Sequence, residues 1–571
     1  MTLEERYQLW CEKATDDADL QVELTAIQGD STAIEERFSR DLEFGTAGLR
    51  GIIGAGSFRM NIYTVRRATQ GLADYLKEKY EGAISVAIAY DSRHKSELFS
   101  KESACVLAAN GIKAYIYPEL APTPALSFAV RELKAQGGIN VTASHNPAAY
   151  NGYKVYGDDG CQMTDAAANA VFEKIQKVDL FAVPTVNFDE AVKNGTIEII
   201  GDEVLERYLD KVQEQCVNPE LAKASGLKVL YTPLNGAGNK CVRAILKRIG
   251  IDNVTVVPEQ EMPDGDFPTC PYPNPEIKQV FECGLKLAEA VKPDLFLATD
   301  PDSDRVGIAV QDGDDYRLFS GNEVGAMLMD YILSQRTQKG DLPKDPFVVK
   351  TIVTTPLVEQ IAKKYNCEVI NVLTGFKYIG DQIARVEAKG EENRYIFGFE
   401  ESYGYLAGTY VRDKDAVVAS MLICEMAAYY KTQGKNLVMA LNDLYREYGY
   451  CLNTTTSYEF DGLAGNERMK EIMSNLRANP PKAIAGDVVV KVSDYKTSEA
   501  VNMLSGIKTE IKLPKSNVLA YVLKNGSSVI VRPSGTEPKI KLYLASFGAT
   551  KADAEKTDAL LKEFMVTYMG I

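Results

Sequence analysis

Residues 84–118 have the sequence ISVAIAYDSRHKSELFSKESACVLAANGIKAYIYP, and their pattern indicates the fold class. Residues 84–92 form a β-rich apolar run that ends in polar residues. Residues 96–111 have the pattern of an amphipathic helix ended by Gly111, and 112–118 have the pattern of the next strand. Strand, helix and strand in this order predict parallel strands joined by a crossover helix. In such sheets, ligand-binding loops follow the carboxyl ends of strands.

The same alternation returns along most of the chain. It is clearest in residues 226–239, 293–304 and 347–356, where a β-rich run leads into a polar loop. This order predicts parallel sheets with helices on both faces, whereas the strand-rich sequence after Tyr448 predicts an α+β domain. No internal repeat is visible as sequence identity. We expect four domains, at 1–208, 209–317, 318–448 and 449–571.

Composition excludes several classes of protein. The chain has 571 residues, too many for one small core, and its 64 Lys and Arg against 79 Asp and Glu give a net charge of −15. So acidic a chain is a poor candidate for a general nucleic-acid binder, because such proteins need a basic face. If the protein binds an anionic substrate, the positive charge must be local. No apolar run approaches the roughly 18–20 residues of a membrane span, and the start MTLEERYQLWCEKATDD does not resemble a signal peptide. The ten cysteines are scattered, so we expect free thiols and a cytoplasmic protein. From the charge and the apolar runs we expect neither nucleic acid nor membrane as a partner.

The segment INVTASHNPAAYNGYKVYG, residues 139–157, is the first candidate for chemistry. Ser144 follows a predicted strand, and we expect it on an exposed irregular turn. A serine nucleophile needs a base, and the nearby candidates are His145 and Lys154. An ordinary polar turn explains the segment about equally well. A Ser-His-Asp hydrolase is disfavoured, because the chain has only two histidines and His145 is adjacent to Ser144.

The segment ATDPDSDR, residues 298–305, is the second candidate. On an extended segment the side chains of Asp300, Asp302 and Asp304 would point the same way. Three carboxylates after a buried strand suit Mg²⁺, and the spacing does not fit an EF-hand. The alternative is an Asp-rich capping turn, which is less favoured because three close carboxylates repel one another without a cation.

Two further segments are weaker on their own. YIFGFEESYG, residues 395–404, offers carboxylates and hydroxyls that could bind a polyol, or it is a solvated turn. SSVIVRPSGTEPK, residues 527–539, could form an anion-binding nest of backbone N–H groups with Arg532 as a clamp, or a plain hairpin.

Two glycine-containing pieces complete the set. They are FGTAGLRG at 44–51, where glycines surround Arg50, and TGFK at 374–377. Neither a Walker-type phosphate loop nor a dinucleotide-binding glycine motif is present, so a nucleotide site of those kinds is disfavoured.

Taken together and in this order, the segments from FGTAGLRG through VTASHNP, DPDSDR and GFEES to RPSGTEPK resemble the α-D-phosphohexomutase family over nearly the whole chain. The similarity is greatest to the branch of long bacterial phosphoglucomutases and their phosphopentomutase-like mammalian relatives. The resemblance implies an α/β fold of four domains around a central cleft. Three domains would be similar α/β units with mixed or parallel sheets, and the C-terminal one a smaller α+β unit.

The resemblance also implies a role for each motif. Ser144 would be the phosphoserine, and its phosphate would complete the shell of a Mg²⁺ ion held by Asp300, Asp302 and Asp304. Lys154 would be the general acid/base, with Arg50 and His145 beside the transferring phosphate and Arg305 beside the metal loop. The sugar would be held by Thr374, Glu400, Ser402 and Lys414, and the non-reacting phosphate by Arg532, Ser534, Gly535 and Thr536.

The implied activity is interconversion of α-D-glucose 1-phosphate and glucose 6-phosphate, with glucose 1,6-bisphosphate as intermediate and activator, by a monomer or homodimer. Mannose or pentose phosphates and bisphosphate synthesis remain open, although the residues at 374–377 and the Glu-Glu-Ser sugar loop favour glucose. A Mg²⁺-dependent phosphohydrolase is the alternative from another enzyme class. A catalytically silent sugar-phosphate-binding protein is disfavoured, because the serine, the lysine and all three aspartates are present.

Overall fold

A computed structural model describes all residues except 46–47, 461 and 535–538. Its described residues form two compact units, which we describe separately. The first unit consists of 1–321, 379–398 and 402–436, and the second of 322–378, 399–401 and 437–571.

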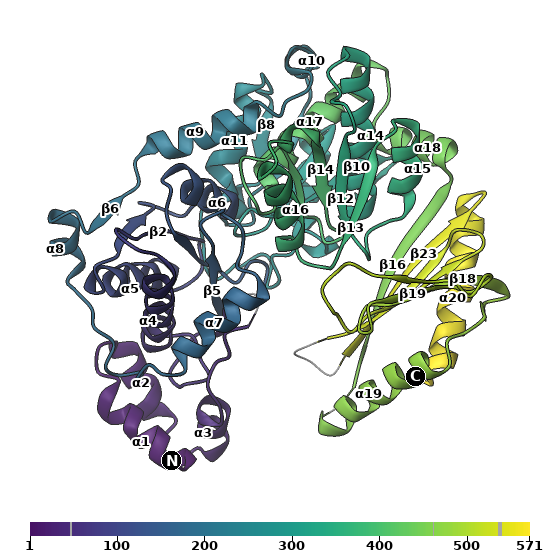
Figure 1. Ribbon diagram of the computed structural model, residues 1–571. Coiled ribbons are helices and arrows are strands. Elements are labelled where there is room, and N and C mark those ends of the chain that lie inside the picture. The colour runs from purple at the N-terminus through teal and green to yellow at the C-terminus, as the bar shows by residue number, and fades with distance from the viewer. Residues whose placement is uncertain (46–47, 461, 535–538) are drawn as a thin grey trace. The chain divides into compact units, whose positions relative to one another are not determined.

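The first sheet of the first unit has six strands in the order β1-β5-β4-β2-β3-β6. β2 is parallel to both β3 and β4, and β5 is antiparallel to β4. From β2 the chain crosses to β3 through α5, and from β3 back to β4 through α6. Right-handed crossovers in opposite directions place these two helices on opposite faces of the sheet (Figure 1). The bounds are β1 Leu49–Ile52, β2 Ser85–Tyr90, α5 Ser96–Ala109, β3 Lys113–Ile116, α6 Thr123–Glu132, β4 Gly137–Val141, β5 Tyr150–Tyr156 and β6 Ile197–Ile199.

The second sheet of this unit repeats the plan of the first. Its order is β11-β10-β9-β7-β8, with β7 parallel to β8 and β9, and β10 antiparallel to β9. The repeat is therefore structural, although no sequence identity reveals it. Ser144 comes shortly after β4, and Asp300 comes directly after β9, the corresponding strand. The bounds are β7 Val229–Thr232, β8 Val254–Val256, β9 Leu295–Thr299, β10 Val306–Asp312 and β11 Asp315–Phe319.

The remaining α/β strands are β12 to β15. β12 (Phe347–Thr351) and β13 (Glu368–Val372) pair in parallel in the second unit. β14 (Tyr395–Phe399) ends directly before Glu400, and β15 (Tyr405–Ala407) follows. A polar loop therefore again follows a buried strand.

The C-terminal part of the second unit is an antiparallel sheet with two helices, which confirms the predicted α+β character. Its strand order is β16-β23-β22-β21-β18-β19-β20, with β17 paired to β18. Alternate residues of β22 contribute to two clusters: Val529 and Val531 pack with α19 and α20, whereas Ile530 packs with Val353. The bounds are β16 Tyr450–Glu459, α19 Gly462–Ala478, β17 Ala483–Ile484, β18 Asp487–Asp494, β19 Glu499–Asn502, β20 Lys508–Glu510, β21 Leu519–Leu523, β22 Ser528–Pro533, β23 Lys539–Gly548 and α20 Lys551–Met569.

Other helices cover these sheets, and the first three helices of the chain form a group of their own at its N-terminal end (Figure 1). These helices are α1 Leu3–Lys13, α2 Ala18–Ala26, α3 Ser31–Phe38, α4 Ile62–Lys79, α7 Asp165–Ile175, α8 Phe188–Lys193, α9 Asp202–Gln213, α10 Pro219–Ala224, α11 Gly238–Arg248, α12 Pro258–Glu261, α13 Glu282–Val291, α14 Gly321–Lys339, α15 Leu357–Lys364, α16 Lys377–Glu387, α17 Ala416–Thr432 and α18 Leu437–Tyr448, with short 3₁₀ turns at Lys278–Phe281 and Glu392–Arg394.

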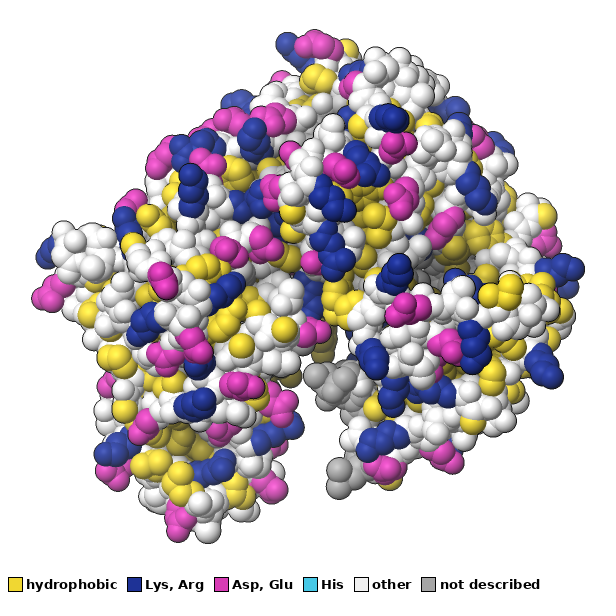
Figure 2. Space-filling model, viewed as in Figure 1, with side chains coloured by type: hydrophobic (Ala, Val, Ile, Leu, Met, Phe, Trp, Pro, Cys, Tyr) yellow, Lys and Arg dark blue, Asp and Glu magenta, His cyan; other side chains and the backbone are white. Residues whose placement is uncertain are grey.

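The surface carries charges of both signs. On the face drawn in Figure 2, Lys and Arg side chains are interspersed with Asp and Glu on both units. Among the described residues, no helix has the length and apolar character that a membrane span requires. The ten cysteines are all free thiols.

Candidate active site

Ser144 lies in a tight turn just after the carboxyl end of β4. Its φ is +51°, in the left-handed region, and its N–H donates to Thr142 Oγ1 at 2.8 Å. The expectation of an exposed turn is wrong, because only 4% of Ser144 is accessible to solvent. Side chains from other loops cover the turn, and they define the chemistry of the hydroxyl.

The Ser144 hydroxyl lies between two groups that can direct it. Its Oγ donates to Asp300 Oδ2 at 2.8 Å and lies 3.1 Å from His145 Nδ1. Burial, reinforced by the nearby charges of Arg305 and Arg50, holds the pKa of His145 well below its ordinary value. His145 is therefore a neutral imidazole beside the serine, and its adjacency in sequence does not prevent the contact.

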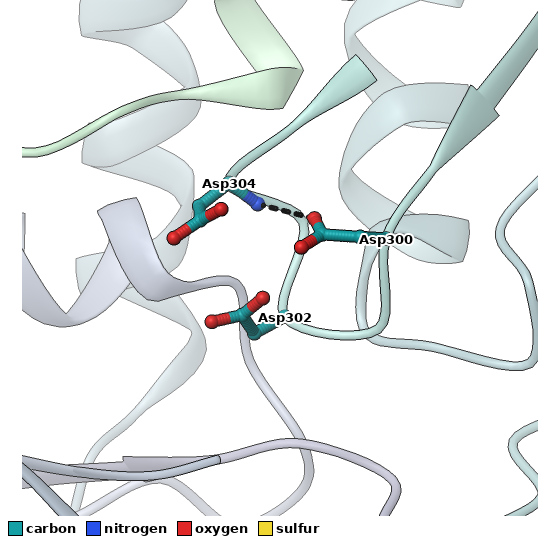
Figure 3. A group of neighbouring side chains, drawn as sticks. All are labelled: Asp300, Asp302 and Asp304. Atoms are coloured by element: carbon teal, nitrogen blue, oxygen red, sulfur yellow. Dashed lines mark hydrogen bonds between the residues drawn. The ribbon is translucent and has the colours of Figure 1, made fainter. Parts of the chain in front are cut away.

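Asp300, Asp302 and Asp304 converge through a turn, not along an extended segment as predicted. The Ser303 N–H donates to the Asp300 carbonyl at 2.9 Å, and Ser303 has a φ of +52°. One Asp300 oxygen accepts the N–H groups of Asp304, at 3.0 Å, and of Arg305 (Figure 3). Each carboxylate offers an oxygen within 4.8 Å of the other two.

The donor set of this turn fits a divalent cation. All three carboxylates are buried, and the Oδ1 atoms of Asp302 and Asp304 accept no hydrogen bond from the described residues. Burial, followed by the charges of Asp302 and Asp304, raises the pKa of Asp300 well above its ordinary value. Mg²⁺ prefers hard oxygen ligands, and its charge would offset the repulsion among the three carboxylates.

Two lysines contact the same carboxylates. Lys154 Nζ lies 2.8 Å from Asp302 Oδ2 and 3.6 Å from Asp304 Oδ2, and Lys414 Nζ lies 3.0 Å from Asp304 Oδ2. Burial alone would lower the pKa of Lys154, but the carboxylates of Asp302 and Asp304 outweigh it and raise the pKa. Lys154 is thus protonated here. Lys414, which the resemblance assigned to the sugar, has its ammonium at the aspartate cluster.

Strand geometry positions the first of these lysines. Lys154 in β5 pairs with Asn140 in β4, and Tyr156, two residues on, lies on the same face of the strand. The Tyr156 hydroxyl donates to Asp413 at 2.7 Å, which fixes the segment that carries Lys414. Gly404 leaves room for that lysine, because a Cβ there would lie 2.1 Å from Lys414 Cδ.

Two arginines lie at the edges of this group. Arg50 in β1 pairs with Gly152 in β5, and its Nη1 donates to Asn146 Oδ1, in the serine turn, at 3.2 Å. Arg305 directly follows the aspartates, and its Nη1 bonds Glu276 Oε1 at 2.7 Å. Both guanidinium groups therefore supply positive charge beside Ser144.

Thr123 at the start of α6 is a positioning contact that sequence reasoning missed. Its Oγ1 donates to Asp302 Oδ2 at 2.9 Å, its N–H donates to the Asp302 carbonyl at 2.8 Å, and Asn140 Nδ2 donates to the same Oγ1 at 2.7 Å. The first sheet thereby orients a carboxylate that follows the second sheet. A threonine after a proline carries no sequence signal for this role.

We expect Thr123→Val to lower kcat about 10–100-fold, as removal of a partner that orients a metal ligand commonly does. The change keeps the shape of the side chain but removes the bond to Asp302 and leaves the Asn140 amide unpaired. Thr69→Val is the matched control, since Thr69 is also buried and its hydroxyl bonds Tyr153 at 2.9 Å. Both variants should lose similar thermal stability, and equal kcat values would contradict the role of Thr123.

The sugar loop predicted from GFEES is divided between the two units. In the second unit, Glu400 is buried and accepts the Gly375 N–H at 2.8 Å, so that Glu400 and the loop of Thr374 lie together. In the first unit, Ser402 precedes Tyr403, whose carbonyl accepts the Val306 N–H at 3.1 Å.

The predicted phosphate loop is described only in part. Arg532 lies in β22 opposite Lys541 of β23, and the Ser534 N–H donates to the Lys539 carbonyl at 2.8 Å. Gly535 and Thr536 lie outside the described residues.

Comparisons with known proteins cover most of the chain. Four family descriptions match in order: "Phosphoglucomutase/phosphomannomutase, alpha/beta/alpha" domain I at 41–181, domain II at 206–313 and domain III at 320–448, and the C-terminal domain at 488–562. A phosphoglucomutase of Staphylococcus saprophyticus is 37% identical over 93% of this chain and 94% of its own length. A phosphoglucomutase of Staphylococcus aureus strain MSSA476 is 37% identical over 94% of this chain and 95% of its own.

Solved structures share the fold. Parafusin (phosphoglucomutase) from Paramecium, in its open form, gives a TM-score of 0.69 at 16% identity and covers 93% of this chain and 96% of its own. A phosphoglucomutase/phosphomannomutase family protein from Burkholderia thailandensis gives 0.67 at 16% identity, covering 92% and 97%. The four matched domains and the extent of the bacterial relatives lead to one conclusion: the chain belongs to the phosphoglucomutase/phosphomannomutase family.

Proposed function

We propose that the protein is a phosphoglucomutase that interconverts α-D-glucose 1-phosphate and D-glucose 6-phosphate through a phosphoserine at Ser144. The observation that carries the proposal is the bond from Ser144 Oγ to Asp300 within a buried cluster of three carboxylates flanked by two lysines. The names of the bacterial relatives support glucose as the sugar.

Phosphoryl transfer requires positioning and neutralisation of charge more than covalent assistance. Asp300, Asp302 and Asp304 would hold Mg²⁺, which when bound neutralises charge on the transferring phosphoryl group. Arg50 and Arg305 would bind the phosphoryl oxygens. Ser144 gives its phosphoryl group to the free hydroxyl of the hexose monophosphate, which yields the 1,6-bisphosphate, and then accepts the other phosphoryl group after the sugar has reoriented.

Lys154 is the group we propose to move the proton of the reacting hydroxyl. It is protonated while it pairs with Asp302, so it would donate its proton to the serine oxygen that loses the phosphoryl group, and the resulting neutral amine would take the proton that the attacking sugar hydroxyl releases. In the second transfer the serine hydroxyl attacks, the sugar oxygen leaves, and the same exchange of protons runs in the opposite direction. Lys414, held at Asp304, would balance the charge of the cluster. This assigns the two lysines different tasks at one cluster.

We propose that residues of the second unit, Thr374 and Glu400, contact the sugar hydroxyls. The supporting contact is the bond between Glu400 and the Gly375 N–H, which fixes a buried carboxylate next to Thr374. A carboxylate so fixed can accept bonds from two sugar hydroxyls. Arg532 would clamp the distal phosphate through its guanidinium, as its place before the sequence Pro-Ser-Gly-Thr suggests.

A coupled assay tests the proposal. Glucose 1-phosphate is supplied with MgCl₂ and a trace of glucose 1,6-bisphosphate, and glucose 6-phosphate is followed through a dehydrogenase. Mannose 1-phosphate and ribose 1-phosphate are assayed in parallel, and free phosphate is measured in each reaction. Rapid Mg²⁺-dependent turnover of glucose 1-phosphate is expected. Turnover of another sugar only would overturn the assigned substrate, and release of phosphate without isomer formation would indicate a phosphohydrolase.

A further inference from the structure

Arg93 is a buried arginine beside the serine turn to which the proposed mechanism assigns no task. It follows β2, whose parallel neighbour β4 leads to Ser144. Because the carboxyl ends of parallel strands meet at one edge of a sheet, the loop after β2 lies against the serine turn. Only 3% of Arg93 is accessible to solvent.

The guanidinium of Arg93 donates to three backbone carbonyls of the serine turn and to that of Tyr150, the first residue of β5. Nη2 bonds the carbonyls of Ser144 and Asn146, and Nη1 bonds those of Pro147, at 2.8 Å, and Tyr150, at 3.1 Å. The turn contains neither helix nor strand between β4 and β5, so these bonds replace the regular pairing that the backbone lacks there. One planar group thus determines the path of the chain on both sides of the nucleophile.

Asp91 fixes the guanidinium from one side. Its Oδ2 lies 3.3 Å from Arg93 Nε and accepts the Thr142 hydroxyl at 2.6 Å, and its Oδ1 accepts the Ser96 hydroxyl at 2.9 Å. Thr142 in turn accepts the Ser144 N–H. The carboxylate therefore connects the arginine to the same turn by a second route.

Phe267 covers the guanidinium from another side. The centre of its ring lies 5.0 Å from Arg93 Cζ, within the range of a cation–π contact. Phe267 belongs to the proline-rich stretch 262–276, which has neither helix nor strand, and is itself buried with a φ of +46°. The end of this stretch carries Glu276, the partner of Arg305. A loop without regular structure thereby contacts the arginines next to both the serine and the aspartates.

We propose that Arg93 is a positioning residue for catalysis: it holds the Ser144 turn so that Oγ faces the aspartate cluster, and Phe267 and Asp91 hold Arg93. The inference rests on the proposed function, because it assumes that Ser144 carries the phosphoryl group. Four carbonyls can be served together by the planar guanidinium, which has five N–H donors, whereas the ammonium of lysine has three donors and no fixed plane. Arg93 should therefore affect the rate of phosphoryl transfer and leave substrate affinity unchanged.

The test compares Arg93→Met and Arg93→Lys with Arg66→Met. Arg66 is a suitable control because it is also largely buried and ion-paired, to Glu102 at 2.7 Å and to Asp16. For each protein we would measure kcat and KM for glucose 1-phosphate, the melting temperature, and the rate at which glucose 1,6-bisphosphate phosphorylates Ser144, by mass spectrometry of the intact protein. Arg93→Met is expected to lower kcat and the phosphorylation rate about 100-fold, as a displacement of a reacting group by about 1 Å does.

Two results would support the positioning role: an unchanged KM, and a kcat for Arg93→Lys below that of wild type. A further variant, Arg93→Ala, adds a third supporting result if millimolar guanidinium chloride partly restores its kcat. Arg66→Met should lose stability but keep its kcat. If Arg93→Met does not fold, Arg93→Lys decides. A kcat equal to wild type in a folded Arg93 variant, at any melting temperature, would overturn the inference. If the wild-type protein turns over glucose 1-phosphate but Ser144 is not phosphorylated by glucose 1,6-bisphosphate, the proposed function is overturned instead.

Discussion

Replacing Ser144 by alanine is expected to lower kcat for glucose 1-phosphate by about 10⁵-fold or more, the usual scale for removal of a nucleophile. The substitution removes the hydroxyl that donates to Asp300 at 2.8 Å. Positioning and charge would remain, but without a phosphoserine to donate the phosphoryl group the reaction has no first step. The coupled assay measures the loss, and mass spectrometry after exposure to glucose 1,6-bisphosphate should show no added phosphate.

Ser100→Ala is the matched control for this variant. Ser100 in α5 is fully buried in the same domain, and its hydroxyl has no hydrogen-bond partner among the described residues. Its removal should leave kcat and the phosphorylation of Ser144 unchanged. Full turnover by Ser144→Ala would contradict the phosphoserine mechanism, because any remaining route would have to use another acceptor.

The parts of the site that sequence reasoning predicts are those that directly follow buried strands. Ser144 follows β4 and the aspartates follow β9, so the alternation of apolar strands and polar loops in the sequence indicates both. Lys154 is close to Ser144 in sequence, which makes it a candidate base, and β5 brings it to Asp302. These residues combine a distinctive chemical type with a predictable place.

The parts that sequence reasoning missed depend on contacts between distant segments. Thr123 bonds Asp302, which lies 179 residues later, and Phe267 covers Arg93 from another sheet's loop. The burial of Ser144 was missed because side chains from other loops cover its turn. The turn at Ser303 was missed because it depends on a positive φ angle that a serine does not indicate. Arg93 could have been suspected, since it follows a parallel strand next to β4.

We expect Asp300→Asn to abolish the response of the protein to Mg²⁺ and to lower kcat about 10³-fold or more, which corresponds to the loss of several kcal/mol of charge stabilisation. The substitution keeps the shape of the side chain, and the amide oxygen can still accept the N–H groups of Asp304 and Arg305. It removes one of three buried carboxylates that repel one another, so the metal-free variant should melt at a higher temperature than metal-free wild type. Thermal unfolding in EDTA and in excess MgCl₂ measures both effects.

The combination of a more stable metal-free protein with lost activity is what distinguishes a metal site from a structural turn. A ligand that binds the folded state raises its melting temperature, so MgCl₂ should stabilise wild type and not Asp300→Asn. Asp558→Asn is the control: Asp558 is buried in the second unit and accepts the hydroxyls of Thr454, at 2.8 Å, and Ser546. Because Asp558→Asn removes two hydrogen-bond partners and relieves no repulsion between carboxylates, this variant should lose stability. It should keep both the Mg²⁺ response and kcat. If Asp300→Asn instead melted below wild type in EDTA and still responded to MgCl₂, the carboxylate would be a structural acceptor for the turn, and the cation would have to bind elsewhere.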